Sequence, residues 1–179
     1  MGAADLTRQA IVTSTKLLVS ERPLDKVSVL DIVRHCGINR NTFYYYFKDK
    51  YDVMEWIFRM EVEPVLAPTL QEKRLAPSVT ALCSHMKNEK AFYTNALQDL
   101  NHGCLRELLV AYYRGFLLEA AAPHFARLHM DEKSQEVIAG FYSHGTIGMI
   151  CQWVSNGMKM DAQFATGLIY LSAKEQFFA

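Results

Sequence analysis

The sequence has no apolar run long enough to cross a membrane and no recognisable leader. Half of its 179 residues are apolar, yet no run approaches the ~18–20 consecutive apolar residues that a membrane-spanning helix needs. The N-terminus also lacks the charged segment followed by an apolar one that is typical of a secretory signal. We therefore expect a cytoplasmic protein that does not associate with a membrane.

Cysteine is scarce, and histidine has no metal-binding pattern. The four cysteines lie far apart and form no C-x-x-C pair, so buried free thiols are expected, not a zinc centre or a disulfide framework. None of the six histidines lies four residues from another, the spacing that places two metal ligands on one helix face. We expect no metal site and no cofactor.

Familiar catalytic patterns are also missing. The chain contains no G-x-S-x-G nucleophile turn, no Walker-type phosphate loop and no H-E-x-x-H. No nucleophile with a nearby base, and no pair of carboxylates, stands out. The sequence therefore predicts a protein that is not an enzyme and has no catalytic residue.

Charge is balanced over the whole chain but divided unevenly along it. Lys+Arg and Asp+Glu both number 19, whereas residues 1–50 hold eight cations and five anions. A basic N-terminal unit on a more acidic remainder is what a DNA-binding protein with a separate regulatory body would show.

Residues 28–50, SVLDIVRHCGINRNTFYYYFKDK, have the spacing of a helix-turn-helix. Ser28 is a plausible N-cap, with an aspartate three residues later. Gly37 can adopt the left-handed conformation that ends a helix. Asn39 is the next N-cap candidate, so a second helix is expected over 40–47. In this motif the second helix enters the major groove of DNA.

The second helix carries side chains suited to DNA. Arginine pairs with guanine and asparagine with adenine, whereas hydroxyl and ammonium groups suit phosphates. Phe43 and Phe47 are expected in the core, but three consecutive tyrosines cannot all face inward, because neighbours on a helix are turned by about 100°. Base contacts are expected from Arg40, Asn41, Thr42 and Tyr45, and phosphate contacts from Ser28, Tyr44, Tyr46 and Lys50, with Asn39 completing the set. The alternative is a helical scaffold without DNA binding, in which these residue types would be accidental.

The same residues resemble a known family. GINRNTFYYYFKDK resembles the end of the DNA-binding domain of TetR-type regulators, whose pattern is roughly G-[VI]-S-x-G-T-[LF]-Y-x-[HY]-F-x-[SN]-K. VSVLDIVRHCG and IVTSTKLLVSERP resemble the two preceding helices of that domain, so the resemblance covers about residues 7–58. Asn41 and Pro23 stand where the family usually or often has glycine. NRNTFYYYFKDKYDVMEWIF is also similar to the dihydroxyacetone-kinase regulator-like branch.

The resemblance implies an all-α fold with two domains. Residues 1–50 would form a three-helix helix-turn-helix DNA-binding domain, and residues 51–179 a helical regulatory and dimerisation domain. A homodimeric repressor would bind a palindromic operator in double-stranded DNA and release it when a small-molecule effector binds the body. The narrower branch implies an alternative, in which a protein partner and not a metabolite controls a regulator or co-activator.

Helices are expected throughout the chain. Arg8 and Lys16 are expected on a solvated face of the first helix, with a position near phosphate as the alternative. The inward stripe of this helix includes Leu6 and Leu17. Prolines 64, 68 and 77 should interrupt the chain after a linking helix, Ser78 should cap the next helix, and Pro123 should stop a later one. The expected helices cover residues 5–20, 51–66, 78–87, 89–100, 105–121, 131–156 and 161–177, besides the helix-turn-helix.

Two further surfaces are expected in the body. Gly140, Gly145 and Gly148 lie within an expected helix, where glycine is tolerable if another helix approaches closely. The last two helices would therefore form the dimer interface, or alternatively an ordinary core. Aromatic and polar side chains at helical spacing predict an effector pocket, although any helical core contains such residues: His85, Phe92, Tyr93, Tyr112, Phe116, Phe141, His144 and Trp153.

Overall fold

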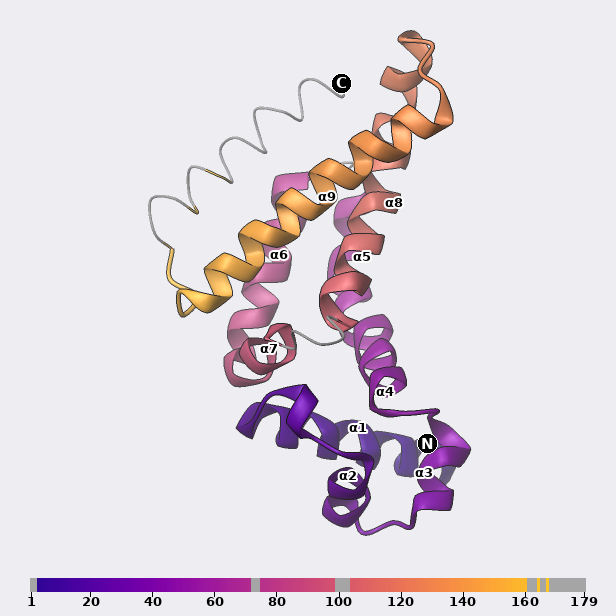
Figure 1. Cartoon of the computed structure of the whole chain (residues 1–179), viewed down its shortest axis with the longest axis vertical. Coiled ribbons are helices and arrows are strands. Elements are labelled where there is room, and N and C mark those ends of the chain that lie inside the picture. The colour runs from indigo at the N-terminus through magenta and orange to yellow at the C-terminus, as the bar shows by residue number, and fades with distance from the viewer. Residues whose placement is uncertain (1–2, 72–74, 99–103, 161–163, 165–166, 168–179) are drawn as a thin grey trace. The chain divides into compact units, whose positions relative to one another are not determined.

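The computed structural model describes residues 3–71, 75–98, 104–160, 164 and 167, and every regular element within them is helical (Figure 1). The all-α prediction is therefore confirmed. Contacts divide the chain into two compact units. Unit 1 comprises Met1–Glu61 and Glu89–Leu105, and unit 2 comprises Val62–Asn88 and Arg106–Ala179.

Unit 1 is built around the first helix. It contains α1 (Ala3–Glu21), η1 (Leu24–Lys26), α2 (Val29–Cys36), α3 (Arg40–Tyr46), α4 (Lys50–Ile57) and α7 (Lys90–Leu97). Helix α1 packs against α2, α4 and α7. Its buried residues include Ile11 and Val19, whereas Leu6 and Leu17 are exposed, so the expected inward stripe was wrong at those two positions.

The division differs from the expected one after residue 50, because α4 and α7 belong to unit 1. Helix α7 buries Phe92, Tyr93 and Ala96. Its Asn95 amide donates to the carbonyls of Val19 and Ser20, at 2.8 and 3.2 Å. These carbonyls lie in the last turn of α1, where helical partners are lacking. Helix α7 therefore caps α1 although it follows it by some 70 residues.

Unit 2 contains the remaining helices. They are α5 (Glu63–Gln71), α6 (Leu75–Asn88), α8 (Cys104–Arg127, whose first residues belong to unit 1) and α9 (Glu132–Ser155). The Ser78 hydroxyl lies 3.1 Å from the hydroxyl of Tyr113, and both residues are buried. The Trp153 ring stacks on Phe164 at 5.3 Å. Asp131 caps α9 as expected, by accepting from the Ser134 N–H.

The prolines interrupt the helices less than expected. Pro77 lies in the first turn of α6, where a proline sacrifices no helical hydrogen bond, whereas Pro64 lies near the start of α5. Pro68 lies inside α5, and a π-turn, η2 (Phe58–Val62), immediately precedes this helix. The expected interruption over these residues was wrong.

Two other boundaries also differ from the sequence-based expectation. Helix α8 continues through Pro123 because Ala121 and Phe125, four residues apart on one face, are both buried. Packing of that face outweighs the lost backbone hydrogen bond. Ser78 lies inside α6 and not at its start. The helix expected over 161–177 lies outside the described residues apart from Phe164 and Gly167.

Candidate nucleic-acid interface

Helix α2 begins with a complete capping box. The Ser28 hydroxyl accepts from the Asp31 N–H at 3.1 Å, and the Ser28 N–H donates to the Asp31 carboxylate at 2.9 Å. These bonds, with one from the Ser28 hydroxyl, hold the pKa of the Asp31 carboxyl below its ordinary value. Arg22 lies 3.2 Å from the same carboxylate. The first helix of the motif therefore has a fixed starting point.

The turn between α2 and α3 requires glycine. Gly37 has a φ of 69°, in the left-handed region, and the following Ile38 N–H donates to Val33 at 3.0 Å. Asn39 then caps α3, because its side-chain oxygen accepts from the Thr42 N–H at 2.8 Å and lies 3.1 Å from the Thr42 hydroxyl. The expected helix, turn and helix are confirmed at these positions.

Helix α3 turns Phe43 inward and its polar residues outward. Phe43 is fully buried. Tyr45 is 81% exposed and Tyr44 is 48% exposed. The Arg40 guanidinium donates to the Tyr44 hydroxyl at 3.3 Å and lies 5.8 Å from the centre of that ring. Arg40 and Asn41 are exposed, so four predicted contacts share the outer side of one helix.

Tyr46 differs from its two neighbours because it is half-buried. The Tyr45 ring meets it edge to face at 5.0 Å between centroids. The Arg8 guanidinium of α1 lies 5.5 Å from the centre of the Tyr46 ring. The expectation that Arg8 lies on a solvated face was therefore wrong, and the sequence gives no signal for this contact across 38 positions.

Lys50 does not present its ammonium group to solvent as a phosphate contact would require. Its Nζ donates to the carbonyls of Leu24, Asp25 and Val27 at 2.7, 3.3 and 2.8 Å. An ammonium has three donors, and three backbone acceptors surround this one. We therefore correct the phosphate assignment for Lys50, which instead ties the start of α4 to the loop before α2.

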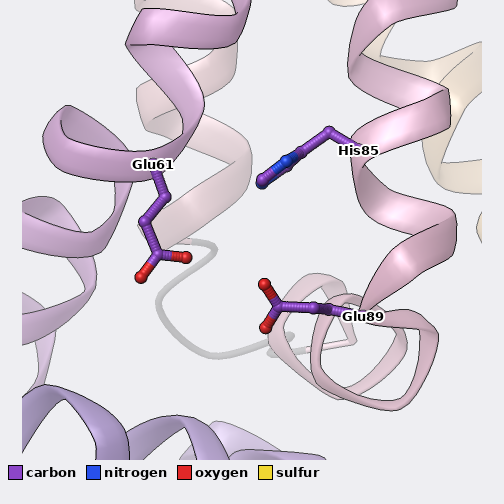
Figure 2. A group of neighbouring side chains, drawn as sticks. All are labelled: Glu61, His85 and Glu89. Atoms are coloured by element: carbon purple, nitrogen blue, oxygen red, sulfur yellow. The ribbon is translucent and has the colours of Figure 1, made fainter.

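Lys16 is likewise held inside unit 1. Its ammonium bonds Glu61 in η2 and lies 2.7 Å from Glu89, which precedes α7. Figure 2 shows these two carboxylates. Burial disfavours the charged ammonium, but the hydrogen bonds and charges of the two glutamates outweigh that effect, so the pKa of Lys16 is raised. The expected solvated position of Lys16 was wrong.

The eight predicted effector residues are divided between the two compact units. Phe92 and Tyr93 are buried in unit 1, whereas the other six belong to unit 2. Within unit 2, Trp153 is buried, but Phe141 is 75% exposed on the opposite side of α9 and His144 is exposed beside it. Burial raises the pKa of Tyr112 to about 12, with a further contribution from Glu63.

The described residues include no helix that is long and apolar enough to cross a membrane. Residues 11–57 match the family described as bacterial regulatory proteins, tetR family. Residues 73–174 match the family described as transcriptional regulator C-terminal region. A comparison with curated proteins gives no match.

Three solved structures are similar over nearly the whole chain. The dihydroxyacetone kinase operon activator DhaS is 16% identical, with coverage of 93% of this chain and 96% of its own and a TM-score of 0.61. The fatty acid degradation regulator FadR from Bacillus halodurans is 14% identical, with coverage of 98% and 95% and a TM-score of 0.58. NalD, the secondary repressor of the MexAB-OprM multidrug efflux pump in Pseudomonas aeruginosa, is 17% identical, with coverage of 98% and 96% and a TM-score of 0.62.

At such identities the structural matches establish the fold alone, and the sequence matches establish the family. The N-terminal match covers the helix-turn-helix, and the C-terminal match by itself spans more than half of the chain. The resemblance inferred from the motif is confirmed, and the chain belongs to the TetR family of bacterial transcriptional regulators.

Proposed function

We propose that the protein is a homodimeric repressor that binds a palindromic operator through α3 and releases it when a small-molecule effector binds. The outer side of α3 carries the proposal, because an arginine, an asparagine and two exposed tyrosines project from a helix fixed by caps at its start and by buried Phe43. These exposed side chains do not contribute to the core, and their polar groups can hydrogen-bond to base edges and phosphates.

Individual contacts follow from the side chains. Arg40, Asn41, Thr42 and Tyr45 would contact base edges, and Ser28, Tyr44 and Tyr46 would contact phosphates. Asn39 would act mainly by fixing the first turn of α3, because its side-chain oxygen already accepts from Thr42. Asn41 would add an adenine contact at the position where the family usually has glycine.

The outer side of α9 supports a homodimer. Val137 and Phe141, four residues apart, are 66% and 75% exposed. Within the part of the chain that the structure describes, a Cβ atom added to Gly140, Gly145 or Gly148 would meet no atom within 4 Å, so packing among these residues does not require glycine there. An apolar surface with glycines that admit a close neighbour is suited to a second copy of the chain, and a dimer presents two α3 helices to a palindrome.

Two buried polar atoms in unit 2 support an effector. The Thr146 hydroxyl and the Trp153 indole nitrogen both lie on the inner side of α9 and have no hydrogen-bond partner among the described residues. A buried polar group without a partner is costly, and a ligand that offers it a partner would recover that energy. A thermal-shift screen against small polar aromatic and acyl compounds, followed by DNA release, tests this part; no stabilising compound would count against it.

Selection of bound duplexes from a random DNA pool tests DNA binding directly. We expect the wild-type protein to enrich a palindrome and Arg40→Ala/Tyr45→Ala to enrich none. Arg40→Ala alone should weaken the free energy of operator binding by about 1–3 kcal/mol and relax specificity at one position of each half-site. Arg114→Ala in unit 2, which also removes one exposed arginine, is the control and should select the wild-type palindrome. A folded, dimeric wild-type protein that enriches nothing would refute the proposal.

A regulator controlled by a protein partner is the second candidate. It is favoured by the run NRNTFYYYFKDKYDVMEWIF, whose resemblance to the dihydroxyacetone-kinase regulator-like branch implies partner control. The structural similarity to a protein described as a dihydroxyacetone kinase operon activator agrees with that branch. Mass measured by size-exclusion chromatography with light scattering separates the candidates. A stable homodimer favours the metabolite-controlled repressor, whereas a monomer that does not bind DNA favours partner control.

A further inference from the structure

The contacts of Arg8 connect three helices of unit 1. Its guanidinium lies 5.5 Å from the centre of the Tyr46 ring at the end of α3 and 4.6 Å from the centre of the Trp56 ring in α4. The Trp56 ring meets the Phe47 ring edge to face at 6.3 Å, and Phe47 is buried. The arginine is thus bound to a partly exposed tyrosine on one side and to a ring anchored in the core on the other.

Neither an ion pair nor close packing accounts for the position of Arg8. The Asp5 carboxylate approaches it only to 4.0 Å, and both side chains are at least a third exposed, so this pair contributes little. A cavity of about 370 Å³ opens beside Arg8 and Trp56. The guanidinium therefore has space to leave, and its attraction to the two rings keeps it in place.

We propose that Arg8 is a positioning residue for DNA binding, which holds the Tyr46 ring, and with it the hydroxyl, at the end of the recognition helix. This inference rests on the proposed contact between α3 and DNA. In this role Arg8 acts on DNA through Tyr46 and makes no phosphate contact of its own, and its Cζ atom lies 5.5 and 4.6 Å from the centres of the two rings. Without it, the Tyr46 ring would rotate among its side-chain conformations, and binding would have to restrict that freedom.

Two substitutions separate positioning from direct charge contact. Arg8→Lys keeps the charge but replaces a planar, weakly hydrated group by a compact, strongly hydrated one, which stacks poorly. Arg8→Met removes the charge as well. If Arg8 positions Tyr46, both variants should bind the selected operator about tenfold more weakly, and the slope of log affinity against log salt concentration should not change.

Direct phosphate contact predicts a different pattern. Arg8→Lys would then bind nearly as tightly as the wild type, and Arg8→Met would lower the salt slope by about 0.9. Arg59→Lys and Arg59→Met are the matched controls, because Arg59 is an exposed arginine in unit 1 that pairs with Glu55; both should bind as the wild type does.

Tyr46→Phe tests the connection between the two residues. Alone, Tyr46→Phe should weaken binding to the operator. The double variant with Arg8→Met should bind no more weakly than the weaker of the two single variants, because both changes remove the same hydroxyl contact. Losses that multiply would overturn the proposal. Thermal denaturation without DNA corrects each affinity for the folded fraction; if Arg8→Met does not fold, Arg8→Lys combined with Tyr46→Phe provides the same comparison.

The possible failures are distinguishable. A wild-type protein that enriches no duplex refutes the proposed function, and with it the basis of the inference. If the wild-type protein binds its operator, and both Arg8→Lys and Arg8→Met bind it as tightly as the wild type does, only the inference about Arg8 is overturned.

Discussion

Lys16→Met is predicted to destabilise unit 1 far more than removal of a typical surface lysine. The ammonium lies 2.7 Å from Glu89 and also bonds Glu61, and its nitrogen lies over the Phe92 ring, 5.5 Å from the ring centre. Methionine keeps the length and apolar part of the side chain but removes the ammonium that bonds the two carboxylates. The substitution therefore tests charge compensation more than packing.

The expected magnitude lies between two known limits. Breaking a fully buried pair by removing one partner costs about 3–5 kcal/mol, because a charge remains uncompensated. Exposed pairs contribute about 0.2–1 kcal/mol. The side chains of Lys16, Glu61 and Glu89 are 18%, 27% and 35% exposed, so solvent screens Glu89 appreciably. We expect a loss of about 2 kcal/mol in the free energy of unfolding, equivalent to a fall of roughly 4–8 °C in Tm for a chain of this size.

Urea unfolding of Lys16→Met, with Lys26→Met as control, measures this loss. Lys26 also lies near an acid, at 3.3 Å from Asp25, but it is 72% exposed, so its substitution should cost under about 0.5 kcal/mol. Adding Glu61→Gln and Glu89→Gln to Lys16→Met should restore most of the lost stability, since the stranded charges disappear. Equal, small losses in the free energy of unfolding for Lys16→Met and Lys26→Met would show that Lys16, Glu61 and Glu89 behave as ordinary solvated surface charges.

Alkaline pH gives an independent check. The folded-state pKa of Lys16 is raised above 10.5, so its stabilisation is fully present below that pH and is lost as the pH rises through the folded pKa. Urea midpoints measured from pH 9 to 12 should therefore fall more steeply for the wild type than for Lys16→Met. Parallel profiles would contradict the assigned pairing.

Three other substitutions test the motif and the proposed dimer. Ser28→Ala should lower the free energy of unfolding by about 1 kcal/mol. Asp31 stabilises the fold above pH 3.8 and loses that effect as the pH falls through its lowered pKa. Between pH 4 and 2 the variant should therefore lose less stability than the wild type in urea unfolding. Gly37→Ala should cost about 1 kcal/mol through backbone strain alone, since its Cβ would meet no atom within 4 Å; unchanged unfolding would contradict the left-handed turn. Phe141→Asp should shift sedimentation from dimer to monomer without lowering the monomer's helicity, and a persistent dimer would place the interface elsewhere.

The helix-turn-helix could be predicted from the sequence because its signals are local. Caps at Ser28 and Asn39, a glycine at Gly37 and the spacing of Phe43 and Phe47 each depend on residues within four positions. Such signals do not require knowledge of the tertiary structure. Helix geometry alone predicted that the three consecutive tyrosines could not all be buried, and it did not predict that Tyr44 and Tyr45 would be the exposed ones.

Contacts between distant segments could not be predicted in this way. Arg8 and Lys16 are charged residues of the kind that usually lie on a solvated helix face. Only the tertiary fold brings Tyr46, Trp56 and Glu89 close to them. The prediction that Pro123 would stop a helix failed for a related reason. The helix tolerates this proline because residues on both sides of it are buried. Burial of a helix face depends on what packs against it, and a short sequence window contains no information about that neighbour.

The shortness of α3 is the reason to expect that such distant contacts affect DNA binding. A helix of seven residues is far below the roughly 12–15 residues that give appreciable helicity alone. Its conformation therefore depends on the packing of Phe43 and Phe47, and the direction of its outer side depends on whatever holds those residues and Tyr46. Lys50 supports that arrangement by joining the start of α4 to the loop before α2. Changes far from α3 in the sequence should consequently alter operator affinity before they unfold the protein, because they loosen the presentation of Arg40 and Tyr45 first.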